Sequence, residues 1–257
     1  MMGGGLLKAL ITGASSGLGL DMARILNKEG YELILVASDR DKLKAVKDEL
    51  GEKAKIIVAD LSIEAKLKEL YVLCKNENID VLINNAGFGD CGDFTETDLS
   101  KEIKMIELNI KAVHVLTKLF LKDMKKKNSG YILNVASMAA FSPGPLMATY
   151  YATKSYVLRL TESIYEELRR SKSKVSISCL CPGPTATNFN KVANVKFSMK
   201  PLNSMQVAMY GLEGMFNKKL VIIPGFRMKC LAFFSRFTPT KLLSRIAYTF
   251  QKRKLYK

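Results

Sequence analysis

The stretch Leu6-Leu7-Lys8-Ala9-Leu10-Ile11-Thr12-Gly13-Ala14-Ser15-Ser16-Gly17-Leu18-Gly19 decides the fold that we expect for this chain. The apolar run at 6–12 predicts a buried strand, and a helical pattern follows from 17 to 28. Gly13 permits a tight turn, Gly17 leaves room for a pyrophosphate, and Gly19 lets the helix approach the strand closely. The first amide groups of the helix would then face the phosphates. The alternative is a simple turn between a strand and a helix.

Apolar runs and helical patterns alternate along the rest of the sequence. The expected strands are 6–12, 32–37, 55–59, 79–84, 130–136, 174–181 and 219–223, and the expected helices are 17–28, 40–50, 63–76, 97–126 and 150–170. Such alternation predicts a parallel sheet with helices on both faces. We therefore expect an α/β fold, a doubly wound, Rossmann-like sheet of about seven strands, formed by residues 1–257 as a single domain.

Length and composition exclude several classes of protein. The 257 residues are 48% apolar, which is ample for a sheet covered on both sides, yet no run reaches the ~18 apolar residues of a membrane span. The N-terminal Met-Met-Gly-Gly-Gly lacks the features of a secretory signal. The five cysteines form no CxxC motif, so we expect buried, reduced thiols, no metal and a cytoplasmic location.

Charge is unevenly distributed. Residues 168–257 contain 18 basic side chains and a single acid, Glu213, so this third carries nearly all of the net charge of +16. Such asymmetry is typical of a surface for an anionic partner, and the alternative is a solvated basic face. Nucleic acid is not expected as the partner, because glycine-rich or aromatic-interleaved basic motifs are missing from the sequence.

A second group of residues predicts chemistry. Lys154 follows Tyr150 by four residues, so the two share one face of a helix, and Ser137 lies thirteen residues before Tyr150. A free phenol titrates near pH ~10, and a fixed cation beside it lowers that pKa. We therefore expect Tyr150 to be a general acid/base with a depressed pKa.

These features together resemble the classical short-chain dehydrogenase/reductase family over roughly residues 6–225. Thr12 to Gly19 matches its TGxxxGxG pattern, and Asn84-Asn85-Ala86-Gly87 matches its NNAG. Pro182-Gly183-Pro184-Thr185-Ala186-Thr187 matches its PGxxxT, and the family's catalytic tetrad falls on Asn109, Ser137, Tyr150 and Lys154. The resemblance implies the strand order 3-2-1-4-5-6-7 and homo-oligomer formation.

The resemblance also implies a role for each site residue. Tyr150 exchanges a proton with a carbonyl or alcohol, and Ser137 bonds the same oxygen. Lys154 lowers the pKa of Tyr150 and holds the nicotinamide ribose, and Asn109 helps to hold a water. The cofactor-binding residues implied are Gly13, Ser15, Ser16, Gly17, Leu18, Gly19, Arg40, Asp60, Leu61, Asn85, Ala86, Gly87, Tyr150, Lys154, Pro182, Gly183, Thr185 and Thr187.

The end of the second strand bears on the choice of dinucleotide. NAD users of the family carry an acid where Ala37 stands, and NADP users often carry arginine where Ser38 stands. Ala37 leaves room for a 2′-phosphate that Arg40 would bind, whereas Asp39 would repel it. We expect NADP, with NAD as the alternative.

Two further segments lie outside these motifs. Residues 184–218 follow a strand and lack a strand pattern, so we expect a substrate lid. Residues 226–257 predict two amphipathic basic helices, for which a peripheral membrane surface, a pocket cover or subunit contact, and plain packing stay open.

The function that we expect is an NADP(H)-dependent oxidoreductase that interconverts a carbonyl and a secondary alcohol. The apolar lid and C-terminus favour an apolar small-molecule substrate, such as a hydroxysteroid or fatty ketone. The alternatives are a 3-ketoacyl-type reductase, whose acidic carrier a basic surface would attract, and a non-catalytic dinucleotide-binding protein at a membrane surface.

Overall fold

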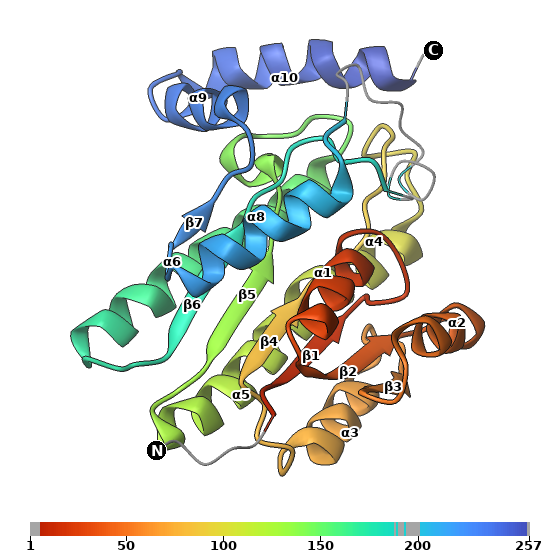
Figure 1. The fold of residues 1–257 in the computed structure, drawn as a ribbon. Helices are drawn as coiled ribbons and strands as arrows, with labels where there is room; N and C mark the ends of the chain where they lie inside the picture. Colours follow the sequence, from red (N-terminus) through yellow and green to blue (C-terminus); the bar gives the residue numbers. More distant parts are fainter. Residues whose placement is uncertain (1–5, 188, 190–192, 194–200, 256–257) are drawn as a thin grey trace.

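The computed structural model describes residues 6–187, 189, 193 and 201–255 (Figure 1). Seven parallel strands form one sheet in the order β3-β2-β1-β4-β5-β6-β7, which confirms the predicted doubly wound topology. The strands are β1 (Lys8–Thr12), β2 (Glu32–Ala37), β3 (Ala54–Val58), β4 (Val81–Asn84), β5 (Tyr131–Val135), β6 (Ser176–Leu180) and β7 (Val221–Ile222). In the central register Leu10 is paired with both Ile34 and Leu82.

Helices cover both faces of this sheet. One face packs against α1 (Gly17–Lys28), α2 (Arg40–Leu50) and α8 (Ser204–Phe216), and the other packs against α3 (Glu64–Cys74), α5 (Val113–Lys127) and α6 (Ala148–Arg170). Successive side chains of a strand point to opposite faces. In β1, accordingly, Ala9 and Ile11 join the first core and Leu10 joins the second, all three fully buried. This two-sided burial is why the strands read as continuous apolar runs.

The predicted helix at 97–126 is interrupted. It is α4 (Leu99–Ile106), a π-helical segment η1 (Glu107–Ala112), and then α5. A π segment holds an extra residue in its turn and is frequent at functional sites. Its sequence, Glu-Leu-Asn-Ile-Lys-Ala, is ordinary for an α-helix, so the sequence pattern gave no sign of it. Asn109 lies in this segment.

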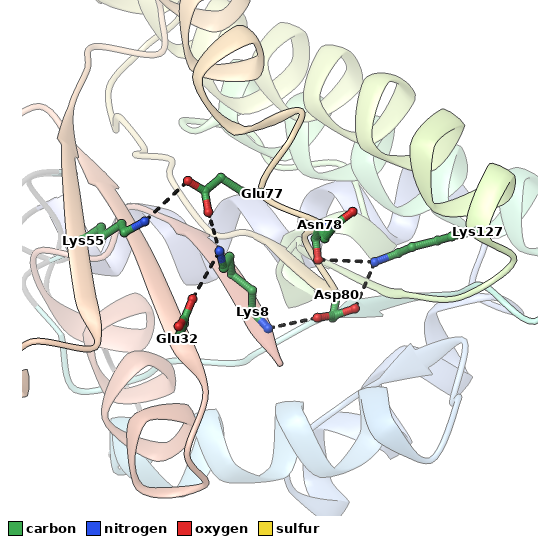
Figure 2. A network of polar contacts seen from close by, with 7 residues as sticks. All are labelled: Lys8, Glu32, Lys55, Glu77, Asn78, Asp80 and Lys127. Atoms are coloured by element: carbon green, nitrogen blue, oxygen red, sulfur yellow. Dashed lines mark hydrogen bonds and ion pairs between the residues drawn. The ribbon is translucent and has the colours of Figure 1, made fainter. Parts of the chain in front are cut away.

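Charged side chains tie the strands together at the edge where the strands begin (Figure 2). The ammonium of Lys8 pairs with Glu77 and, at 3.2 Å, with Glu32, while its backbone N–H donates to Asp80 Oδ2 at 3.0 Å. Lys127 Nζ reaches the other oxygen of Asp80 at 2.9 Å. Burial lowers the pKa of Lys8, but its bonds to Glu77 and Glu32 outweigh that effect and hold the pKa above its ordinary value. The network fixes the beginning of β1 against its neighbours.

The segment predicted as a lid divides into two parts. Residues 204–216 form α8, which packs on the sheet through Ala208, Leu212 and Met215 and so belongs to the helical layer. Before it, Thr185 and Leu202 form an isolated bridge, supported by a bond from the Leu202 N–H to Pro184 O at 2.9 Å. The chain between them is described only in part, and a lid there stays a prediction.

The two C-terminal helices are confirmed as α9 (Phe226–Ser235) and α10 (Thr240–Leu255). Figure 1 shows them next to each other at one end of the molecule, beyond the sheet. Among the residues that the structure describes, no helix has the length and apolar character needed to cross a membrane. Cys74, Cys91, Cys179 and Cys181 are buried, as predicted, whereas Cys230 on α9 is partly exposed.

Candidate active site

The glycine turn between β1 and α1 has the geometry that its sequence predicts. Gly13 and Gly17 have φ values of +66° and +55°, in the left-handed region that favours glycine. A Cβ on Gly19 would lie 2.4 Å from Gly13 O, so only glycine allows this approach of helix and strand. The N-cap Ser16 makes no side-chain bond to the helix, and the first turn of α1 has no acidic residue. The first amide groups of α1 therefore remain available to an anionic group.

The end of β4 is fastened to this turn. Asn85 Nδ2 donates to the carbonyl oxygens of Thr12 and Gly13, each at 3.1 Å. In return Thr12 Oγ1 accepts from the backbone N–H groups of Asn85 and Ala86, at 3.0 and 3.1 Å. These bonds fix Asn85, Ala86 and the Gly13 turn as one rigid floor, which is a structural reason for the asparagine in the Asn-Asn-Ala-Gly motif.

Tyr150 and Lys154 lie one turn apart on α6, and Ser137 follows the end of β5. Tyr150 and Lys154 are both buried. Lys154 Nζ donates to Val135 O at 3.0 Å and lies 5.9 Å from the centre of the Tyr150 ring. A side-chain hydrogen bond joins Ser137 to Tyr150. Serine, tyrosine and lysine therefore meet at one place, as the spacing predicted.

The predicted depression of the Tyr150 pKa is wrong for this structure. Burial raises the pKa of Tyr150 well above its ordinary value, and the hydrogen bond with Ser137 only partly opposes that rise. Burial also lowers the pKa of Lys154 to about 8. Both shifts have one cause, because a dry pocket disfavours the charged form of either group. The sequence showed the cation beside the phenol but not the loss of water around both.

The side chain of Asn109 makes its hydrogen bonds with Phe88 and Thr153 and not, within the described part of the chain, with the other three candidates. It is fully buried, its Oδ1 accepts from the Phe88 N–H at 3.1 Å, and its Nδ2 donates to Phe88 O at 2.9 Å and Thr153 Oγ1 at 3.1 Å. A Cβ on Gly87 would lie 2.8 Å from Asn109 Oδ1 and 3.4 Å from Lys154 Nζ. Asn109 thus braces the segment beside Lys154, and its predicted water-holding role stays a prediction.

Most of the predicted site residues line one cavity of about 350 Å³. It extends from the glycine turn to Tyr150. Of the predicted residues, it is lined by Gly13, Ser15, Ser16, Gly17, Leu18, Asn85, Ala86, Gly87, Ser137, Tyr150, Lys154, Pro182, Gly183, Thr185 and Thr187. These fifteen residues come from segments far apart in the sequence, and they converge because the carboxyl ends of parallel strands share one edge of the sheet.

Four predicted cofactor contacts do not line this cavity. Gly19 is a packing residue, Leu61 is buried in the core, and Arg40 is exposed at the start of α2. The carboxylate of Asp60 accepts from the Ser62 hydroxyl at 2.6 Å and from Lys104 Nζ at 2.9 Å. A contact of any of the four with a cofactor stays a prediction.

Sequence reasoning missed the apolar end of the cavity. This end is lined by Phe88, Met138, Ala139, Met147, Tyr151 and Phe189. The ring of Tyr151 lies 6.1 Å from that of Tyr150, and its hydroxyl accepts a hydrogen bond from Gln251 Nε2 on α10. The position of Tyr151 directly after Tyr150 was a usable signal, whereas nothing in the sequence related it to Gln251.

The comparison with known proteins agrees with this site. The family model of the short chain dehydrogenases matches residues 8–196. A short-chain dehydrogenase from Sphingobium yanoikuyae in complex with NADPH is 29% identical, with a TM-score of 0.81 over 90% of this chain and 94% of that one. A family member from Burkholderia phymatum in complex with NAD is 25% identical, with a TM-score of 0.81 over 91% and 94% of the two chains.

A third similar structure is the bulky-bulky ketone specific alcohol dehydrogenase from Comamonas testosteroni. It is 28% identical, with a TM-score of 0.79 over 90% of this chain and 93% of that one. The chain belongs to the short-chain dehydrogenase family, and its class is that of the oxidoreductases.

Proposed function

We propose that this protein is an NADP(H)-dependent oxidoreductase that interconverts an apolar ketone and its secondary alcohol. One observation carries the proposal: Ser137 and the buried Tyr150 and Lys154 meet in the wall of a cavity whose far end is the glycine turn. That arrangement brings proton-transfer groups and an anion-binding helix start to one edge of the sheet, where ligands of this architecture bind.

The residues present fit a dinucleotide. The turn at Gly13 and Gly17 leaves the backbone open toward the cavity, and the start of α1 offers amide groups with no capping side chain. At the far end of the same cavity, Lys154 is positioned to hold a ribose hydroxyl. The similar structures in complex with NADPH and with NAD have this fold over nearly the whole chain.

NADP is the cofactor that the end of β2 favours. Asp39, the residue that argues against a phosphate, caps α2 by accepting from the Lys42 N–H at 3.1 Å and pairs with Lys42 Nζ at 2.6 Å. The side-chain bond from Lys42 lowers the pKa of Asp39, and its charge is compensated locally. Ser38 and Arg40 are exposed beside it, and arginine binds a phosphate bidentately.

The raised pKa of Tyr150 keeps its phenol protonated at neutral pH, which is the form that a proton donor in the direction of reduction requires. When bound, the nicotinamide supplies a hydride to the carbonyl carbon. Tyr150, neutral at pH 7, donates its proton to the oxygen that becomes the alcohol, and Ser137 bonds the same oxygen. Lys154 stabilises the phenolate that remains. The residues hold donor and acceptor in place before the reaction, so little reorganisation is needed.

The substrate end of the cavity favours an apolar ketone. Phe88, Met147 and Phe189 present apolar side chains there, and methionine adapts to irregular ligands. The likeness to a dehydrogenase specific for bulky-bulky ketones supports the same substrate class. Hydroxysteroids and fatty ketones are the members of this class that we propose, and small polar sugars would lose hydrogen bonds on entry.

The test is ketone reduction followed by nicotinamide absorbance, with Tyr150→Phe compared with Tyr156→Phe. Tyr156 lies on the same helix, partly exposed, and contacts His114 rather than the cavity. Tyr150→Phe removes the proton donor and should lower kcat by at least about 100-fold, the size expected for loss of general acid catalysis. Tyr156→Phe should retain wild-type turnover. Equal activity of the two variants on a verified substrate would contradict the mechanism.

A further inference from the structure

The outward face of α9 is formed by phenylalanine. Phe226, Phe233, Phe234 and, just after the helix, Phe237 are each more than half exposed. The Phe233 ring lies 5.5 Å from that of Phe234 and 5.2 Å from that of Phe237, so three of the rings form one cluster. On the opposite side of the helix Met228 is buried against Gly183 of the cavity wall. The helix is therefore fixed to the protein with its aromatic side outward.

A second apolar row lies on α10. Leu242, Ile246 and Phe250 follow one another at intervals of four residues and are each about half exposed. The helix is held from another side, where Gln251 is buried and bonds to Tyr151. Soluble monomers rarely expose contiguous apolar patches above a few hundred Å² without a binding function. Two adjacent helices with such rows, at the same end of the molecule, form an unusual surface (Figure 1).

Positive charge accompanies these rows. Residues 226–257 include nine Lys and Arg and no Asp or Glu. Arg227, Arg236, Lys241 and Arg245 are exposed on the two helices. On α10, Lys241 and Arg245 each directly precede a residue of the apolar row, and helical geometry places them on the flank of the helix beside that row. An apolar row flanked by basic residues is the pattern of helices that lie in the plane of a membrane interface.

We propose that the outer faces of α9 and α10 bind the surface of an anionic lipid bilayer. The phenylalanine side chains of α9 enter the boundary between headgroups and acyl chains, and the basic side chains contact lipid phosphates. The basic residues are attracted by the negative surface potential of such a bilayer, and burial of the aromatic side chains adds hydrophobic free energy. The protein lies on the bilayer and does not cross it. The proposal does not depend on the enzymatic function.

Charge distinguishes the bilayer from a second copy of the chain. In a twofold dimer the same patch meets itself, so the basic residues of one copy would face those of the other. With no acidic residue in 226–257 to pair with them, that contact juxtaposes like charges and is unfavourable. An anionic bilayer complements both the apolar rows and the charge.

The experiment is co-sedimentation of the full chain with phosphatidylcholine vesicles with and without phosphatidylglycerol, at low and high salt. We expect binding to the anionic vesicles that weakens with salt, because the basic residues are screened. Phe233→Ser/Phe234→Ser and Lys241→Glu/Arg245→Glu should each lower the partition coefficient at least about tenfold, since each pair removes two of the contacts above. All four side chains are exposed, so the fold should persist, which circular dichroism checks.

Matched controls alter the same chemistry elsewhere. Val72→Ser/Leu73→Ser removes two exposed apolar side chains from α3, and Lys44→Glu/Lys53→Glu reverses two exposed charges near α2. Neither control should lower binding as much as its counterpart. Equal binding to neutral and anionic vesicles, or equal effects of the controls, would overturn the proposal. The proposal would also be overturned if the wild type did not bind vesicles and light scattering showed that Phe233→Ser/Phe234→Ser converts a dimer to a monomer.

Discussion

Lys154 connects the burial of a single side chain to the pH dependence of the enzyme. Its ammonium is buried, bonded to Val135 O, and has its pKa lowered to about 8 by desolvation. As the pH rises through about 8, the group loses the charge that we assign to stabilising the Tyr150 phenolate. Below that pH the charged form predominates.

We therefore expect kcat/KM for NADPH, which reports the free enzyme, to fall as the pH rises through about 8. Lys154→Arg should move this limb to higher pH whatever its absolute activity, because a guanidinium keeps its proton. The measurement is a pH profile of initial rates for both proteins. A flat wild-type profile across this range, or an unmoved limb in the variant, would contradict the assignment.

The residues predicted from sequence are those whose spacing is local. Tyr150 and Lys154 are one helical turn apart, and the glycines of 13–19 lie in a single turn. Their chemistry can therefore be predicted from the sequence without knowledge of the fold. Tyr151 and Gln251 are a hundred positions apart, and only packing brings them together. The pKa shift of Tyr150 was predicted with the wrong sign because burial, unlike spacing, is a property of the whole pocket.

At the scale of elements, α10 is joined to the cavity wall by a polar pair formed by the buried Gln251 and the half-buried Tyr151. Gln251 Nε2 donates to the Tyr151 hydroxyl, whereas Gln251 Oε1 is buried with no hydrogen-bond partner among the described residues. Burial raises the pKa of the Tyr151 hydroxyl to about 12. Either partner alone would therefore be left buried and unsatisfied if the other were removed.

The two single substitutions at this pair should together cost more stability than the double substitution. Tyr151→Phe and Gln251→Leu each leave one polar group of the pair without its hydrogen-bond partner, which should lower the free energy of unfolding by about 1–3 kcal/mol. The double variant removes both polar groups and leaves neither without a partner. Its loss of unfolding free energy should therefore be smaller than the sum of the two single losses by at least about 1 kcal/mol. Urea unfolding of the four proteins measures this, and strictly additive losses would show that the two side chains do not interact.

Elements were predicted best where one periodicity runs without interruption. The seven strands and helices such as α6 were found because apolar runs and helical faces are long. The π segment around Asn109 was missed because an extra residue in one turn leaves no trace in composition. Residues 204–216 were assigned to a lid, yet their apolar face packs on the sheet as α8.

For the whole molecule, dinucleotide binding should appear as added thermal stability. A ligand at a hundred times its Kd stabilises the folded state by about 2.7 kcal/mol, which is about 5–10 °C in Tm for a chain of this size. We expect NADPH to raise Tm more than NADH at equal concentration. Arg40→Ala should reduce the NADPH shift and leave the NADH shift unchanged, because only NADPH carries the 2′-phosphate.

Equal shifts with the two dinucleotides, in both proteins, would contradict the preference for NADP. A larger shift with NADH would favour NAD instead. Neither result would affect the family assignment, which rests on residues 8–196 as a whole. Homo-oligomer formation and a cytoplasmic location stay predictions from the sequence.

The bridge between Thr185 and Leu202 has an evolutionary consequence. The bridge joins the two ends of the segment between Thr185 and Leu202. The number of residues in that segment therefore does not alter the register of β6 and β7. Lengthening a closed loop costs free energy only logarithmically. We expect this stretch to be where relatives insert, delete and diverge, and a transplant of it between them to leave the scaffold intact.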